Sequence, residues 1–234
     1  AAVSLLSRFY LLKDDRGVKE GVKVKLCDHI WLLESSRAQG NVPGFHCYLV
    51  KDSEGLTMID TSLPGRNKAI REEIESLGFE IGDLKRIFLT HTDIDHIGNA
   101  LPLQLDSGCK VYLSEEEKKY LAGEYKRLPK KEEMFQKSHF QFPEVEAYPE
   151  DLNEYQIISS PGHTRGHVCI LYEDCLFAGD ACSTENGKIA LPEKTFCENI
   201  ELAAQSLRKV SLRNFGLWCP CHGEPKGHKM EWRG

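Results

Sequence analysis

The sequence predicts a single α/β domain that spans all 234 residues. Apolar residues make up 41% of the chain and charged residues 28%, which is typical of a compact soluble protein. Short apolar or alternating segments, typical of strands, are separated by segments with helix start and stop signals. This succession occurs twice along the chain, so we expect two αβ halves within one domain.

The first half begins with strands and continues into helices. Strands are expected at residues 22–27, 29–33, 45–50 and 56–60, where polarity alternates or apolar residues cluster. A helix is then expected from Pro64 to about Leu77, because Gly78 is a natural C-terminal stop. A second helix is expected from Ile94 through Leu103.

The middle and the second half follow the same rules. After a strand at residues 110–113, Ser114 and Glu117 have the spacing of a capping box, which predicts the start of another helix. Further strands are expected between residues 155 and 177, and a helix is expected from about Asn199 to Val210.

A cluster of metal-binding residue types follows the apolar run at residues 86–89. His91, Asp93, Asp95 and His96 lie within six residues, on a loop that leaves a predicted buried strand. Imidazole nitrogens and carboxylate oxygens are preferred ligands of zinc, manganese and iron. A strand end holds such a loop in place, and the short spacing lets the side chains surround a common centre. The cluster therefore predicts a metal site.

Three later residues repeat this pattern of a short apolar strand, a small or glycine-rich turn and a ligand-type side chain. They are His163, Asp180 and His222. In this order the motifs resemble those of the metallo-β-lactamase superfamily, whose members carry H-x-H-x-D-H followed by a His, an Asp and a final His. The resemblance covers nearly the whole chain. It implies an αββα sandwich, in which two mixed β-sheets lie face to face and are flanked by helices.

The resemblance also implies a ligand set. His91, Asp93 and His163 would hold a first ion, Asp95, His96 and His222 a second ion, and Asp180 would bridge the two. Asp60 and His167 match family positions that orient the ligands without binding metal, a task that metal sites generally need. For Asp60, a cap of the turn after its strand is the alternative.

One position departs from the family pattern, because Asp93 stands where a His is usual and the first motif reads H-x-D-x-D-H. The flavodiiron proteins, a branch of the superfamily, have a Glu there and bind two irons. We therefore expect two divalent ions, with zinc as the first choice and iron or manganese as alternatives that Asp93 would favour. A further alternative is that Asp93 is too short to reach the ion, which would leave one site weak or empty.

The expected activity is that of a metal-dependent hydrolase. A hydroxide bridging the two ions would attack a small ester, thioester, lactone or phosphoester, and Asp95 and Asp180 are the expected catalytic residues. One alternative is a di-iron redox enzyme of flavodiiron type, which would act on oxygen or nitric oxide with a separate electron donor. The other is a non-catalytic metal-binding sensor module.

The segment at residues 114–152 separates the first motif from His163 and is rich in basic and aromatic residues. We predict that it is a helical lid insertion that contacts an anionic or apolar substrate. The alternative is a solvated helical segment whose apolar face packs on the core.

The charge and the cysteine content limit which binding partners and which cellular location are expected. The net charge of −6 gives no reason to expect nucleic-acid binding, and no apolar run approaches a membrane span. The start of the chain lacks the features of a signal peptide, and the nine cysteines are expected to be reduced thiols, so a cytoplasmic location is predicted. The expected partner is a small-molecule substrate, and a homodimer is left open. Cys219 and Cys221 are expected to pack beside His222, with a redox or metal role as the alternative.

Overall fold

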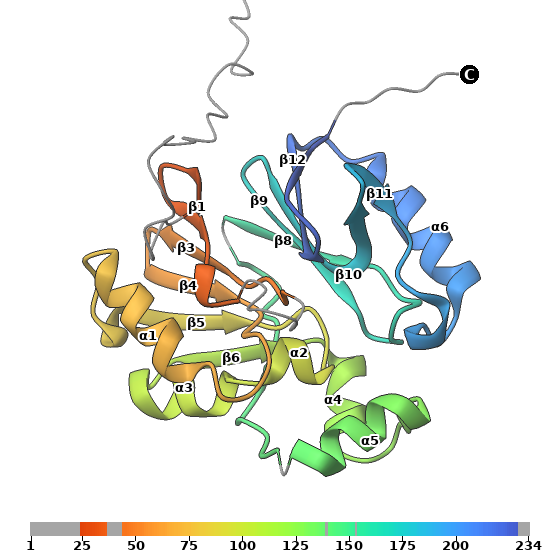
Figure 1. The fold of residues 1–234 in the computed structure, drawn as a ribbon, viewed down its shortest axis with the longest axis horizontal. Coiled ribbons are helices and arrows are strands. Elements are labelled where there is room, and N and C mark those ends of the chain that lie inside the picture. The colour runs from red at the N-terminus through yellow and green to blue at the C-terminus, as the bar shows by residue number, and fades with distance from the viewer. Residues whose placement is uncertain (1–23, 37–43, 139, 153, 229–234) are drawn as a thin grey trace, which may run out of the picture.

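Two mixed β-sheets pack face to face with helices on their outer sides (Figure 1), the αββα sandwich that the sequence predicts. The structure is a computed structural model, and it describes residues 24–36, 44–138, 140–152 and 154–228. Residues 22 and 23 of the first predicted strand lie outside the described residues. Within the described part of the chain, no helix is long and apolar enough to cross a membrane.

The first sheet has seven strands in chain order. They are β1 (Val24–Cys27), β2 (Ile30–Leu32), β3 (Tyr48–Asp52), β4 (Gly55–Ile59), β5 (Leu84–Phe88), β6 (Lys110–Leu113) and β7 (Glu146–Ala147). The pairs from β1 to β4 are antiparallel, and those from β4 to β7 are parallel. The parallel strands therefore end at one edge of the sheet, where the loop after β5 carries the first ligand-type residues.

The second sheet is built from the second half of the chain. Its strands are β8 (Tyr155–Ser159), β9 (Val168–Tyr172), β10 (Cys175–Glu185), β11 (Lys188–Ala190), β12 (Leu217–His222) and β13 (Lys226–Gly227). The order is β13-β12-β10-β9-β8, with β11 paired to β10. Parallel pairing of β10 with β12 brings the residues of these two strands side by side, so that Asp180 and His222 come from neighbouring strands.

Six α-helices and three short 3₁₀ turns complete the described fold. The helices are α1 (Asn67–Ser76), α2 (Ile94–Ile97), α3 (Ala100–Ser107), α4 (Glu115–Leu121), α5 (Pro129–Ser138) and α6 (Ile200–Ser211), and the turns are Glu34–Ser36, Ile81–Asp83 and Lys194–Phe196. Helices α1 and α3 flank the first sheet and α6 flanks the second (Figure 1). Helices α4 and α5 fall in the segment predicted to form a lid, and that role stays a prediction.

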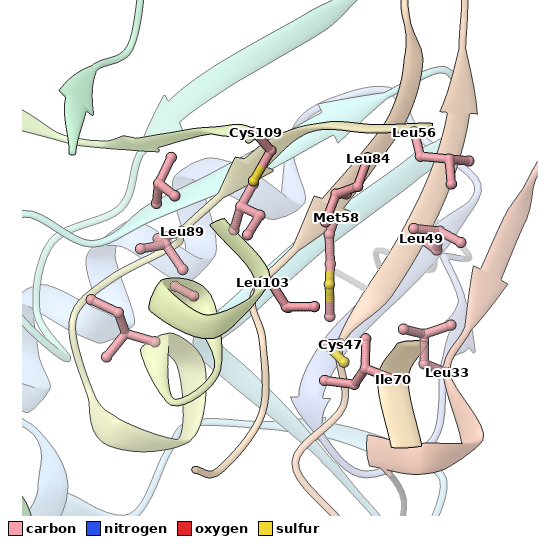
Figure 2. Close-up of a cluster of buried hydrophobic side chains, with 14 of the residues drawn as sticks. Leu33, Cys47, Leu49, Leu56, Met58, Ile70, Leu84, Leu89, Leu103 and Cys109 are labelled. Carbon is pink, nitrogen blue, oxygen red and sulfur yellow. The ribbon is translucent and has the colours of Figure 1, made fainter. Parts of the chain in front are cut away.

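The apolar core fills the spaces between these layers. Leu49, Met58, Ile70 and Leu103 belong to the cluster between the first sheet and its helices (Figure 2). A second cluster, centred on Phe88 and Phe177, contains side chains of both sheets. Each fully buried side chain of this size stabilises the fold by about 1.5–3 kcal/mol.

The prediction of one helix from Ile94 through Leu103 was wrong, because the chain forms two helices that are interrupted at Gly98 and Asn99. A Cβ atom on Gly98 would lie 2.3 Å from the carbonyl oxygen of Ser62, so only glycine allows this close approach. The side-chain amide of Asn99 donates to the carbonyls of Thr61 and Leu63. The break therefore arises from contacts with the loop after β4, which local sequence does not reveal.

A buried ion pair joins strands β3 and β5 away from the predicted site. An oxygen of Asp52 lies 2.7 Å from the Arg86 guanidinium and also accepts from Thr57 and Tyr155. Burial raises the pKa of Asp52, but these hydrogen bonds, that from the Glu54 amide and the Arg86 charge outweigh it and leave the pKa below its ordinary value.

We expect Asp52→Asn to lower the free energy of unfolding by about 3 kcal/mol at pH 7, because the variant leaves Arg86 without its buried partner. A depressed pKa adds stability above the ordinary pKa of aspartate, and this stability is lost as the pH falls through the folded value. The difference from the wild type should therefore shrink below about pH 4. Urea unfolding at pH 7 and below about pH 4 tests this prediction, with the exposed Glu133→Gln as control. An equal loss at both pH values would contradict the assignment.

Candidate metal centre

The seven predicted ligand side chains come together at one end of the sandwich. The loop after β5 and helix α2 supply four of them, the loop between β8 and β9 supplies His163, and strands β10 and β12 supply Asp180 and His222. All are buried except His222, whose side chain is 35% exposed. Their role as ligands stays a prediction.

We define the first set as His91, Asp93, His163 and Asp180, whose donor atoms lie within 4.8 Å of one another. The Asp93 Oδ2 atom lies 2.9 Å from His163 Nε2 and 3.3 Å from His91 Nε2. The Asp93 carboxylate therefore reaches both histidines of the set, and whether it binds an ion stays a prediction.

We define the second set as Asp95, His96, Asp180 and His222. The Oδ1 atom of Asp180 lies 3.3 Å from His96 Nε2 and 3.4 Å from His222 Nε2, and Asp95 Oδ2 lies 3.5 Å from His222 Nε2. The other oxygen of Asp180 lies 3.3 Å from His163 Nε2 in the first set. Asp180 thus turns one oxygen to each set, as a bridging ligand would.

Several donor atoms at this place lack hydrogen bonds. Among the described residues, the buried His91 Nε2, His96 Nε2 and Asp180 Oδ1 atoms have no hydrogen-bond partner. Unpaired buried polar atoms are costly unless something binds them. Two of the three, His96 Nε2 and Asp180 Oδ1, belong to the second set and lie next to each other. The second set therefore fits a divalent cation.

The charges of the second set support this fit. Burial lowers the pKa of His222, but the Asp180 and Asp95 carboxylates, together with Cys221, raise it well above its ordinary value. Two carboxylates thus attract positive charge to the site. Among the described residues, neither Asp95 nor Asp180 forms an ion pair with a lysine or arginine.

Cys221 also lies beside the second set. It is buried, and its sulfur lies within 4.8 Å of the donor atoms of Asp95, His96 and His222. The sequence interpretation favoured packing beside His222 over a metal role; the structure places the thiol beside the second set as a candidate ligand. Its direct adjacency to His222 was the only signal in the sequence. Cys219, in contrast, packs in the core between the sheets.

Asp60 stabilises the loop that follows β5. Its carboxylate accepts hydrogen bonds from the Thr90 amide and hydroxyl, both at 2.8 Å, and its Oδ2 atom lies 2.7 Å from His96 Nδ1. This contact turns the other ring nitrogen of His96 toward Asp180. Such contacts are those of the predicted orienting residue, although the two bonds to Thr90 also cap the turn.

His167 acts on the opposite side of the site. Its Nε2 atom accepts a hydrogen bond from the Asp180 amide at 3.0 Å, and its Nδ1 atom lies 2.8 Å from the Ser160 hydroxyl. The ring therefore contacts the backbone of Asp180 and lies outside both sets, and its predicted supporting role stays a prediction.

Glu117 is a positioning residue, whereas its spacing from Ser114 predicts a capping box. Ser114 caps α4 by accepting from the Glu117 amide, as the capping box predicts. The Glu117 carboxylate does not complete that box; it is fully buried and accepts from the amide and hydroxyl of Thr92 and from the Gly166 amide. Helix α4 thereby ties together the two loops that carry His91, Asp93 and His163.

Lys131 of α5 enters the first set. This buried lysine places Nζ 2.5 Å from Asp93 Oδ2 and 3.1 Å from His163 Nε2. Burial raises the pKa of Asp93, but the charge of Lys131 and the contacts with His91 and His163 hold it well below its ordinary value. Burial and the Lys131 charge lower the pKa of His163 to about 4, so this ring is neutral at pH 7.

A cavity of about 400 Å³ opens onto both sets. Apolar side chains from α2, α5 and the segments around β3 and β11 contribute most of its surface. They are Phe45, Ile94, Met134, Phe135, Pro192 and Phe196. Two of these residues, with Lys131, belong to the predicted lid segment, so that segment supplies part of the cavity wall.

The family model described as the metallo-beta-lactamase superfamily matches residues 42–209. The chain belongs to this superfamily. The probable metallo-hydrolase YflN of Bacillus subtilis is 30% identical over 70% of this chain and 73% of its own. The probable polyketide biosynthesis zinc-dependent hydrolase BaeB of Bacillus velezensis is 26% identical over 87% of this chain and 85% of its own.

A solved structure shows the same fold. The metallo-beta-lactamase family protein TTHA1429 of Thermus thermophilus superposes with a TM-score of 0.68 at 20% identity, and the match covers 87% of this chain and 76% of that one. The predicted enzyme class, a metallo-hydrolase of the metallo-β-lactamase superfamily, is that of the named relatives.

Proposed function

We propose that this protein hydrolyses a small carboxylic ester, thioester or lactone with an apolar acyl part, in a metal-dependent reaction. The observation that carries the proposal is the mainly apolar cavity that opens directly onto buried metal-binding side chains. Concave apolar sites with a few convergent polar groups are typical of small-molecule binding.

The second set would hold the catalytic ion, through Asp95, His96, Asp180 and His222. A divalent ion bound there supplies a Lewis acid and lowers the pKa of water toward neutrality. The Asp95 carboxylate lines the cavity, where it can accept a proton from water. Asp60 keeps the Nε2 atom of His96 directed at the site, and the apolar walls bind the acyl part and exclude bulk water.

The charges around the cavity favour a neutral carbonyl compound over a phosphoester. Lys131 is the single lysine or arginine among the described lining residues, and Asp93 already pairs with it. The lining also contains five carboxylates, those of Asp93, Asp95, Asp180, Glu185 and Glu193. An anionic phosphodiester would meet this negative surface, whereas an ester with a hydrocarbon chain would not.

The choice of zinc as the metal rests on the donor set and on one relative. Imidazole and carboxylate ligands, with the thiol of Cys221 nearby, suit zinc well. The BaeB relative is named a zinc-dependent hydrolase.

A substrate panel tests the proposal. We expect the zinc-loaded protein to hydrolyse nitrophenyl esters with kcat/KM rising from acetate to hexanoate by about ten-fold or more, because each buried methylene adds binding energy. Thioesters and lactones of similar size should be turned over, and bis(nitrophenyl) phosphate should be slower. A preference for the phosphodiester would contradict the proposed substrate class. Bound metal with no turnover of any panel member would indicate the sensor module.

A further inference from the structure

We propose that the ammonium group of Lys131 takes the place of the first ion, so that the protein binds one divalent ion, in the second set. The inference rests on the proposed metal-dependent function, because it specifies how many ions that function uses. It departs from the expectation of two ions, and it names Lys131 as the resident cation of the first set.

The contacts of Lys131 engage two of the donor atoms that a first ion would need. Its Nζ atom lies 2.5 Å from Asp93 Oδ2, the central acceptor of the first set, and 3.1 Å from His163 Nε2. An ammonium group has three N–H donors and no acceptor, so both contacts engage lone pairs of the ligand atoms. Two of the three ligands predicted to hold only the first ion are therefore already bound.

An ion in the first set would also be repelled. Zinc lies about 2 Å from its nitrogen and oxygen ligands, so an ion bound to Asp93 Oδ2 would lie within about 5 Å of Lys131 Nζ. At that separation a doubly charged ion and an ammonium group repel strongly in a buried site, where water screens poorly. The first set thus fits one cation, and Lys131 supplies it.

Lys131 is held in this place by the packing of its helix. Phe135 lies one turn further along α5, on the same face, and packs into the apolar cluster beneath the first sheet. The guanidinium of Arg127 lies 4.2 Å from the centre of the Phe135 ring. Lys130, the neighbour in sequence, is exposed, whereas Lys131 is only 4% exposed. The direction of Lys131 is therefore fixed by the anchored helix.

The second set differs from the first because no lysine or arginine pairs with its carboxylates in the described part of the chain. Its Asp95 and Asp180 have only histidine partners among the described residues, so their negative charge calls for an added cation. The pair of Asp93 and Lys131 also gives a physical reason for the departure of the first motif from the family pattern. A carboxylate at position 93 pairs with an ammonium group, which a histidine would do poorly.

Zinc stoichiometry tests the proposal without relying on activity. The wild type, Lys131→Met and the control Lys130→Met are saturated with zinc, freed of excess by gel filtration and measured by plasma mass spectrometry. We expect one zinc per chain in the wild type and in Lys130→Met, and two in Lys131→Met, since methionine keeps the length but removes the charge. Two in the wild type, or one in Lys131→Met, would overturn the proposal.

A second variant keeps the test decisive if Lys131→Met does not fold. His91→Ala removes a ligand of the first set only, so it should leave one zinc per chain unchanged if Lys131 fills that set. Loss of one zinc from a wild-type content of two would overturn the proposal while leaving the hydrolase function intact. A wild type that binds no zinc would overturn the proposed function and this inference together.

Discussion

Replacement of Asp180 by Asn is expected to lower kcat/KM for the best panel ester by about 10³-fold or more, which corresponds to roughly 4 kcal/mol. Asp180 is buried and places one oxygen 3.3 Å from His96 Nε2 and 3.4 Å from His222 Nε2. The amide is neutral and binds a divalent ion more weakly than a carboxylate. Zinc content should therefore fall together with turnover.

The control for this variant is Asp106→Asn, at the end of α3, where Asp106 pairs with Arg71 away from the cavity. That change should leave zinc content and kcat/KM unaltered. An Asp180→Asn protein that keeps both its zinc and its turnover would show that Asp180 is not at the reacting centre.

Replacement of Asp60 by Asn should weaken zinc binding by about 10–100-fold, the usual effect of losing a carboxylate that orients a histidine ligand. Asp60 lies 2.7 Å from His96 Nδ1 and holds that ring in position. Because Asp60 contacts His96 but does not line the cavity, turnover should recover largely at saturating zinc, and Kd can be measured by competition with a chelating dye.

The same variant separates the two interpretations of Asp60. An orienting residue changes zinc affinity, whereas a residue that only caps the turn after β4 changes the unfolding free energy alone. Unchanged zinc affinity with lowered stability would therefore leave Asp60 as a cap of the Thr90 loop.

The sequence predicted the sandwich through the resemblance of its motifs to the superfamily, and those motifs could be recognised because they follow local patterns. Each ligand-type residue comes within or directly after a short apolar strand, and strand ends meet at one edge of a sheet. The helix break at Gly98 was missed because its cause is the backbone around Ser62, more than thirty residues earlier in the chain.

The role of Lys131 could not be predicted for a related reason. Lys130 and Lys131 are adjacent members of a basic run, and successive residues of a helix point in directions about 100° apart. Which of the two turns inward depends on how α5 is anchored by Phe135, and that anchoring is a tertiary contact. The contacts of Glu117 with Thr92 and Gly166 could not be predicted either, because these two loops are distant from it in sequence.

The most direct measurement is the turnover of the best panel ester before and after removal of metal with a chelator, and after zinc is added back. We expect turnover to be lost with the metal and restored by zinc, because Asp95 and Asp180 form no ion pair with a lysine or arginine in the described part of the chain. A metal-free protein that hydrolyses the ester at the full rate would contradict metal-dependent hydrolysis at this site.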